Sequence, residues 1–358
     1  MLNVIGKANQ LVDAPPEVES KTLYTDTPIV QDYIKELAAN SFGQDPNSVT
    51  VGEMSSTTIK NSIAYTKPEN HELSMVFQFH HLKTDYKNGE KWSKMPYDFK
   101  ALRNILHTWG QQLDQGGGWQ ALFWNNHDQP RALNRFGDVG QYRVKSAEML
   151  AAAIHLSRGT PYIYMGEEIG MTDPHYHSMA DYVDVEAKNA YQALLKAGKS
   201  EQEAFAIIVA KARDNSRTPM QWDDTANAGF TTGTPWLRPT NQREINVKAE
   251  LAHGEIFRFY QKLIALRKQY QVISDGSYVP FGTEIDRLYA YERVAGDVHL
   301  LVLNNFSDKA ITVPLPPRFQ HARVLITNEA DLTPTATMTL PPCLLYTSPS
   351  PRDLSTSR

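Results

Sequence analysis

The first 271 residues alternate short apolar runs with segments of helical pattern, and this alternation constrains the fold more than any other feature of the sequence. The runs are rich in β-branched or aromatic residues and lie at 49–53, 75–81, 121–128 and 159–168. Elsewhere apolar residues recur every three or four positions, which predicts helices at 28–37, 99–113, 146–156 and 249–270. Because strands that alternate with helices are typical of βαβ units, we expect an α/β fold with four parallel strands.

The sequence from Val272 onward has a different texture, with short apolar runs interrupted by glycine, aspartate and proline. The runs at 288–291 and 299–303 predict a small antiparallel β domain at 272–342, incomplete at its end. Residues 343–358 contain Ser-Pro pairs and a polar end, which are unfavourable in a β ladder. We therefore interpret this tail as non-native sequence that does not continue the sheet.

Charge and composition exclude several classes of function. The net charge is -4 and no long block of lysine and arginine occurs, so nucleic acid is not an expected partner. No apolar run approaches the length of a membrane span, and the first residues lack the layout of a signal peptide, so no membrane association is expected. The only cysteine, Cys343, lies in the tail, which excludes a disulfide framework and a cysteine metal site elsewhere. These features suit a cytoplasmic protein, and they leave its oligomeric state open.

Histidines occur in two small groups without the companions that a metal site needs. The pairs are His80 with His81 and His175 with His177, and no further ligands follow at metal-binding spacing. We therefore expect no metal, and no motif indicates a redox cofactor.

Two acidic residues stand where predicted strands end, Glu53 after Val-Thr-Val-Gly and Asp128 after the run that begins at Ala121. A (β/α) barrel places its chemistry at the carboxyl ends of its parallel strands. Hydrolysis of a glycosidic bond with retention uses two carboxyl groups, one as nucleophile and one as acid and base. Glu53 alone is equally compatible with a solvated residue at a strand end. An ordinary turn is the alternative for Asn126-His127-Asp128, but the whole run from Asn125 to Arg131 is a specific signal that favours the catalytic interpretation.

The segments that end in Glu53 and in Asn125-Asn126-His127-Asp128 together resemble the α-amylase superfamily of glycoside hydrolases. The resemblance implies that Glu53 is the general acid/base, and that Asp128 and His127 grip the sugar undergoing cleavage. It also implies that the four strands are strands five to eight of a (β/α)8 TIM barrel at residues 1–271. A complete barrel of this kind needs about 250 residues before insertions, so we expect the C-terminal half of one.

The family's nucleophile is an aspartate in a pattern like Arg-x-Asp-x-x-Asn at the end of strand four. If Asn3 is the asparagine of that pattern, the nucleophile is the residue immediately before Met1. The resemblance therefore implies a fragment that lacks its nucleophile and is inactive as given.

The stretch from Arg213 to Trp222 resembles a signature of the branch that contains oligo-1,6-glucosidases and trehalose-6-phosphate hydrolases. In that branch an arginine helps to fix the non-reducing glucose, which implies a pocket that acts on chain ends. By position we favour Arg213 over Arg217 for this role. A guanidinium group suits neighbouring hydroxyls and a nearby carboxylate.

The segments 53–58 and 75–82 resemble trehalose-6-phosphate hydrolases more than oligo-1,6-glucosidases. Gln78 and Lys83 are candidate substrate-binding residues, with Lys83 preferred over Lys87 and Lys91 for a phosphate because an ammonium group holds it as a point charge. The implied reaction is cofactor-free retaining hydrolysis of a small sugar phosphate, trehalose 6-phosphate, to glucose and glucose 6-phosphate. The alternatives are an oligo-1,6-glucosidase or α-glucosidase for neutral oligosaccharides, and a catalytically dead glucosidase-like subunit.

Overall fold

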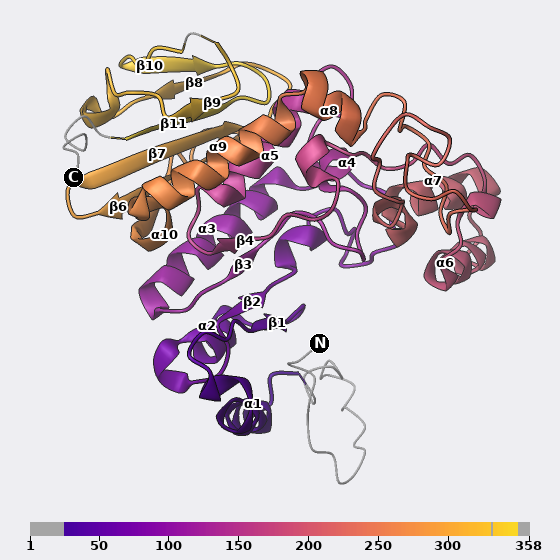
Figure 1. Cartoon of the computed structure of the whole chain (residues 1–358), viewed down its shortest axis with the longest axis horizontal. Coiled ribbons are helices and arrows are strands. Elements are labelled where there is room, and N and C mark those ends of the chain that lie inside the picture. Colours follow the sequence, from indigo (N-terminus) through magenta and orange to yellow (C-terminus); the bar gives the residue numbers. More distant parts are fainter. Residues whose placement is uncertain (1–24, 331, 350–358) are drawn as a thin grey trace.

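The computed structural model describes residues 25–330 and 332–349, and Figure 1 shows their arrangement. The segment around Asn3, where the family's strand-four pattern is expected, lies outside the described residues. Within the described ranges, no helix is both long enough and apolar enough to cross a bilayer.

Four parallel strands follow one another in sequence order, as predicted. β1 pairs with β2 and β3 pairs with β4, and a parallel bridge from Val76 to Gln120 joins the two pairs. Each strand is shorter than its apolar run, and β2, β3 and β4 leave the ladder before the polar residues that end their runs, whereas β1 includes Glu53. The strands are β1 (Val51–Glu53), β2 (Met75–Phe77), β3 (Ala121–Leu122) and β4 (Thr160–Pro161).

Helices follow the parallel strands, and their ends have clear local causes. Asp98 accepts a hydrogen bond from the backbone N–H of Ala101 and so caps α3, which ends at Gly117 in the left-handed region. The predicted helix 249–270 is wrong as one element, because it breaks at Gly254 into α8 and α9. The helices are α1 (Pro28–Asn40), α2 (Ile59–Thr66), α3 (Phe99–Gly116), α4 (Ala132–Phe136), α5 (Arg143–His155), α6 (Val185–Lys196), α7 (Glu201–Lys211), α8 (Val247–His253), α9 (Ile256–Gln269) and α10 (Gln271–Asp275).

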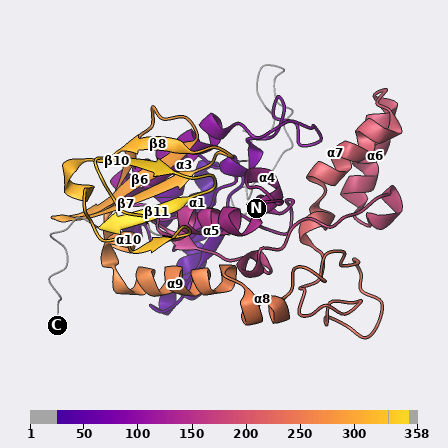
Figure 2. The same cartoon turned by 90° about the horizontal axis from the view of Figure 1, so that it is seen from above.

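Helices α6 and α7 form a hairpin between β4 and α8 that the sequence analysis did not predict. Both views place this hairpin at the opposite end of the molecule from the antiparallel sheet (Figures 1 and 2). Ser200 caps α7 through a reciprocal pair of bonds with Glu203, and the two helices share an apolar cluster with Tyr176, Tyr182 and Leu237 of the neighbouring loops, apart from the main core. The hairpin is therefore a separately packed unit.

The prediction of an antiparallel β domain after Val272 is confirmed. Five strands pair in the order β5-β6-β7-β11-β9, every pair antiparallel, and β8 pairs with β10 in a second ladder. The strands are β5 (Ser277–Phe281), β6 (Leu288–Ala295), β7 (Val298–Asn305), β8 (Ile311–Pro314), β9 (Ile326–Thr327), β10 (Thr337–Leu340) and β11 (Leu345–Pro349).

The prediction that the sheet stops before Cys343 is wrong. β11 lies between β7 and β9, with Tyr346 opposite both Leu303 and Thr327. Leu345 and Tyr346 are buried, and this burial favours the ladder. Pro349 is the last residue of the strand, where its missing N–H interrupts no further pairing. Residues 350–358 lie outside the described residues.

The parallel strands and the five-stranded sheet share one hydrophobic core. Helix α5 is buried along its whole second half, between residues near β3 such as Trp124 and sheet residues such as Tyr291 and Val302. The hydroxyl of Tyr291 donates to the carbonyl of Ala153 at 3.1 Å, which ties the sheet to this helix. The antiparallel sheet thus supports the barrel-like part and lies away from the carboxyl ends of β1 and β3 (Figure 1).

Glu148 on α5 makes the stability of this core dependent on pH. Burial, together with the carboxylates of Glu255 and Glu250, raises the pKa of Glu148 to about 8. The folded state therefore keeps a proton that the unfolded chain loses near pH 4.5. Since the unfolded state binds fewer protons between these values, this carboxyl makes the free energy of unfolding fall as pH rises from about 4.5 to about 8.

We expect Glu148→Gln to remove this contribution, because an amide stays neutral throughout the range. The loss in unfolding free energy between pH 5 and pH 8 should shrink by roughly 1–4 kcal/mol, since one pKa unit corresponds to about 1.4 kcal/mol. Urea unfolding at several pH values measures it, with Glu36→Gln on the exposed face of α1 as the control. Equal pH slopes for Glu148→Gln and the unaltered chain would contradict the assignment.

Candidate active site

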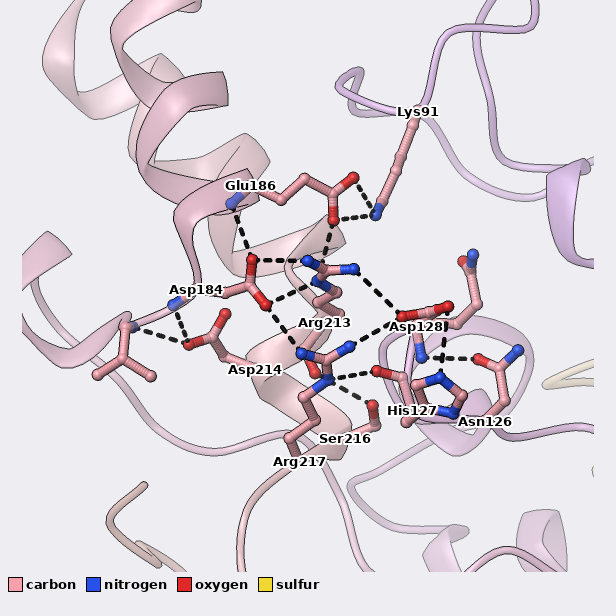
Figure 3. A network of polar contacts seen from close by, with 12 residues as sticks. Lys91, Asn126, His127, Asp128, Asp184, Glu186, Arg213, Asp214, Ser216 and Arg217 are labelled. Atoms are coloured by element: carbon pink, nitrogen blue, oxygen red, sulfur yellow. Dashed lines mark hydrogen bonds and ion pairs between the residues drawn. The ribbon is translucent and has the colours of Figure 1, made fainter. Parts of the chain in front are cut away.

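Asp128 is the centre of a polar network at the carboxyl end of β3 (Figure 3). Its Oδ1 accepts hydrogen bonds from Arg213 Nη1 at 3.3 Å and from Arg217 Nη2 at 2.9 Å. The His127 ring lies on the other side, with Nε2 3.5 Å from Asp128 Oδ2. The structure thus brings together His127, Asp128 and Arg213, three of the residues that the sequence indicated.

The backbone around Asp128 is fixed by side chains of the same segment. Asn126 accepts the Asp128 N–H at 3.0 Å, which shapes the turn. Asn125 accepts the N–H of Ala132 and donates to the partly buried carboxyl group of Glu167, each at 2.6 Å. Glu167 also accepts from the Tyr260 hydroxyl at 2.8 Å, so the turn is anchored to α9. These bonds keep Asp128 in place before any ligand arrives.

Arg217 takes a larger part in the site than the sequence analysis assigned to it. It makes the shorter contact with Asp128, and its Nε donates to the His127 carbonyl at 2.6 Å. Arg213 and Arg217 are four residues apart around the single turn η8 (Arg213–Ser216), so both guanidinium groups project the same way. Both arginines therefore hold Asp128, and the preference for Arg213 as the ligand of the non-reducing glucose stays a prediction.

Asp184, which the sequence analysis missed, binds both arginines. Its carboxylate accepts from Arg213 Nε at 2.7 Å, from Arg213 Nη2 at 3.0 Å and from Arg217 Nη1 at 2.9 Å. Burial favours the neutral acid, but the hydrogen bond and charge of Arg213 dominate and hold the pKa of Asp184 below its usual value. In the sequence an aspartate at this position indicates a helix cap at most, and no helix was predicted here.

Glu186, two residues into α6, extends the network toward the loop after β2. Its carboxylate lies 3.3 Å from Arg213 Nε and accepts from Lys91 Nζ at 2.8 and 2.9 Å. Lys91 also lies over the ring of Trp92, 5.0 Å from its centroid. The charge of Lys91 is therefore already compensated by Glu186 within the fold.

Glu53 is exposed at the last position of β1, and Lys83 reaches the loop that follows it. Lys83 ends the turn η5 (His80–Lys83), and its Nζ donates to the Ser55 carbonyl at 3.3 Å. Because β1 to β4 are parallel and adjacent, Glu53 and Asp128 lie at the same edge of the strand layer. Lys83 thus stands beside the loop that follows Glu53, and its role in substrate binding stays a prediction.

Gln78 is buried and serves the η5 turn. Its Nε2 is 3.0 Å from His81 Nδ1, and its Oε1 accepts the N–H of His80 at 2.8 Å. Burial lowers the pKa of His81 to about 3, so this ring is neutral, and its Nε2 lies 2.9 Å from the Phe123 carbonyl. Both polar atoms of Gln78 are occupied within the fold, and its role in substrate binding stays a prediction.

No group of three or more histidine, cysteine, aspartate or glutamate side chains within residues 25–330 and 332–349 is arranged to hold a metal ion. The arrangement that is present consists of a carboxylate held by two guanidinium groups and a second, exposed carboxyl at the same sheet edge. Such a set of functional groups can bind hydroxyl groups and transfer protons.

The family model of the α-amylase catalytic domain matches residues 1–276, and that of the C-terminal domain of the α-amylase SusG matches residues 288–347. The chain belongs to the α-amylase family. It is 48% identical over 96% of its length to the trehalose-6-phosphate hydrolase of Bacillus subtilis, of which it covers 62%. It is 42% identical over 92% of its length to the oligo-1,6-glucosidase of Parageobacillus thermoglucosidasius, of which it covers 60%.

Solved structures give the same result. The crystal structure of Bacillus licheniformis trehalose-6-phosphate hydrolase superposes with a TM-score of 0.92 at 47% identity, covering 97% of this chain and 64% of that one. Isomaltulose synthase from Erwinia rhapontici NX5 superposes with a TM-score of 0.88 at 30% identity, over 98% and 64% of the two chains. The chain thus spans less than two thirds of the length of the relatives that it matches.

Proposed function

We propose that this chain carries the sugar-binding and acid/base part of a retaining α-glycoside hydrolase that cleaves trehalose 6-phosphate to glucose and glucose 6-phosphate. The observation that carries the proposal is Asp128, held by Arg213 and Arg217 at the same sheet edge as Glu53. Glu53 would protonate the leaving oxygen and then activate water. Asp128 and His127 would bind the hydroxyls of the cleaved glucose and stabilise its developing positive charge.

The proposal includes a half barrel. β1 to β4 would be strands five to eight of a (β/α)8 barrel, and the nucleophile would come from a segment outside the described residues. Within those residues β1 pairs only with β2, and β4 only with β3. Apolar side chains are exposed beside these outer strands, with Val49 70%, Val51 37%, Ile163 39% and Met165 39% accessible. Unpaired edges and exposed apolar residues support further strands on both sides.

Trehalose 6-phosphate is favoured over a neutral oligosaccharide by two observations. The Bacillus subtilis relative named for that substrate shares more identity with this chain than the Parageobacillus oligo-1,6-glucosidase does. Lys83 also lies beside the loop after Glu53, where the leaving sugar is expected. A dead glucosidase-like subunit fits less well, because Glu53, His127 and Asp128 are all present.

The test uses this chain alone and in an extended form. In the extended chain, the amino-terminal part of the Bacillus subtilis relative that precedes its match is joined to the present sequence. We expect the chain alone to leave trehalose 6-phosphate intact, and the extended chain to release glucose and glucose 6-phosphate. Hydrolysis by residues 1–358 alone would refute the half barrel, and a preference of the extended chain for isomaltose would favour the oligo-1,6-glucosidase alternative.

Lys83 offers a second test, directed at the substrate. In the extended chain Lys83→Ala should lower kcat/KM for trehalose 6-phosphate about ten- to a hundredfold, since a charge-assisted hydrogen bond contributes about 1.5–3 kcal/mol. Turnover of a neutral aryl α-glucoside should change little, and the selective loss should shrink with added salt. Lys309→Ala, in the β domain, is the control. Equal losses on both substrates would exclude Lys83 as the phosphate ligand.

A further inference from the structure

Asp184 contacts both arginines that hold Asp128, although it belongs to the α6–α7 hairpin and not to the strand layer. Its Oδ2 accepts from both Arg213 Nε and Arg217 Nη1, just as Asp128 Oδ1 accepts from both residues. Figure 3 shows the two carboxylates on opposite sides of the two guanidinium groups. The four groups form a closed ring in which negative and positive charges alternate.

The ring needs both carboxylates to be stable. Two guanidinium groups that share a single carboxylate oxygen repel each other, and their net charge is then positive. With Asp128 and Asp184 both ionised, the four charges cancel. The Asp184 side chain is only 5% accessible, against 35% for Asp128. Solvent therefore screens the ion pairs of Asp184 with the arginines less than those of Asp128.

Asp184 is itself fixed by the segment that carries the arginines. The N–H groups of Val183 and Asp184 donate to Asp214 Oδ1 at 2.8 and 3.1 Å. Asp214 lies in the η8 turn directly after Arg213 and is fully buried. The start of the hairpin and the η8 turn that carries Arg213 are therefore joined twice, once through the side chain of Asp184 and once through that of Asp214.

We infer that Asp184 is a positioning residue, which holds Arg213 and Arg217 as one rigid unit on Asp128. The inference deepens the proposed function and rests on it for its catalytic consequence. Asp184 touches no sugar in this scheme. It acts through the arginines, which hold the Asp128 carboxylate in place before the sugar binds. Asp128 then loses less conformational freedom in the transition state.

A purely structural role for Asp184 can be separated experimentally. Asp184 Oδ1 also accepts the N–H of Glu186 at 2.8 Å and so caps α6. Asparagine caps helices about as well as aspartate but carries no charge. Asp184→Asn therefore keeps the cap and removes the charge that binds the arginines. Ser200→Ala, which removes the cap of α7 in the same hairpin, serves as the matched control.

The first readout requires no activity. Arg217 Nε donates to the His127 carbonyl and does not touch Asp184, so its N–H reports on the arginine pair as a unit. In NMR spectra of this chain and of the extended chain, Asp184→Asn should accelerate hydrogen exchange of the Arg217 Nε–H about tenfold or more, as expected when a charge-assisted contact is lost. Ser200→Ala should leave it unchanged. Unaltered Arg217 exchange in Asp184→Asn would overturn the inference.

The second readout is kinetic. In the extended chain Asp184→Asn should lower kcat/KM about ten- to a hundredfold, while Ser200→Ala stays near the unaltered value. Asp184→Glu should recover part of the loss. In an Arg217→Gln background, Asp184→Asn should lower kcat/KM by a clearly smaller factor, since the effects of residues that act through one another are not additive. Full additivity would overturn the inference, whereas an extended chain that is inactive before any substitution would refute the proposed function instead.

Discussion

Replacing Glu53 with glutamine in the extended chain should reduce kcat for trehalose 6-phosphate by about 10² to 10⁴, the range typical of general acid-base catalysis. Glutamine has nearly the same shape as glutamate but neither donates a proton to the leaving oxygen nor accepts one from water. KM should change little, because Glu53 lies exposed at the end of β1 and the Asp128 carboxylate is held by Arg213 and Arg217. Steady-state kinetics with glucose 6-phosphate detection measures the loss.

The leaving group provides the control for this substitution. An acidic phenol needs little protonation to leave an aryl α-glucoside. In Glu53→Gln the rate of the first step should therefore fall much less for this glucoside than for trehalose 6-phosphate. The second step still needs a base, and a small anionic nucleophile such as azide should restore part of the turnover. A loss below about tenfold on trehalose 6-phosphate would assign the acid/base role to another residue.

The sequence predicted those parts of the site in which local pattern and chemistry coincide. Glu53 and Asp128 each end an apolar run, and parallel strands bring such ends to one edge of a sheet. Lys83 follows the β2 run by a few residues, so its neighbourhood was predictable in the same way. What the pattern did not reveal was the length of the strands, because β3 and β4 leave the ladder while the sequence is still apolar.

Asp184 was not predictable, because its partners lie 29 and 33 residues away across two helices. Locally it has only the signature of a helix cap, and most aspartates with that signature do nothing more. The contact of Arg217 with the same carboxylate as Arg213 was not predictable for a related reason. Sequence position does not tell which side chains of a single turn face a distant carboxylate.

Two predictions about the fold were wrong because they rested on residue preferences and apolar spacing alone. Ser-Pro pairs argued against a last strand, yet Leu345 and Tyr346 are buried in the centre of the sheet and Pro349 stands at its end. The pattern 249–270 argued for one helix, yet Gly254 ends α8 and a new helix begins at Ile256. At the last strand tertiary packing decided, and packing is not visible in a single sequence. At Gly254 the cause is local, because the Glu250 side chain accepts the N–H of Phe257 at 3.0 Å.

Asp128→Asn in the extended chain should lower kcat/KM about 10² to 10³, comparable to the removal of other groups that face developing charge. The transition state of glycoside cleavage resembles an oxocarbenium ion, which a carboxylate stabilises and an amide does not. The substitution also leaves Arg213 and Arg217 beside the sugar with Asp184 as their shared carboxylate. The charge facing the sugar therefore changes from balanced to positive, so the loss should exceed that of Asp184→Asn.

Ligands of different charge separate this electrostatic effect from simple damage to the pocket. A protonated iminosugar resembles the positively charged transition state, whereas glucose resembles the neutral product. Asp128→Asn should weaken iminosugar binding by about tenfold or more beyond its effect on glucose, because only the cation loses an opposite charge. The difference should persist at moderate salt, since the Asp128 side chain is only 35% accessible and the pair is partly shielded from screening. Equal losses for both ligands would mean that Asp128 shapes the pocket without supplying the charge on which the proposed mechanism depends.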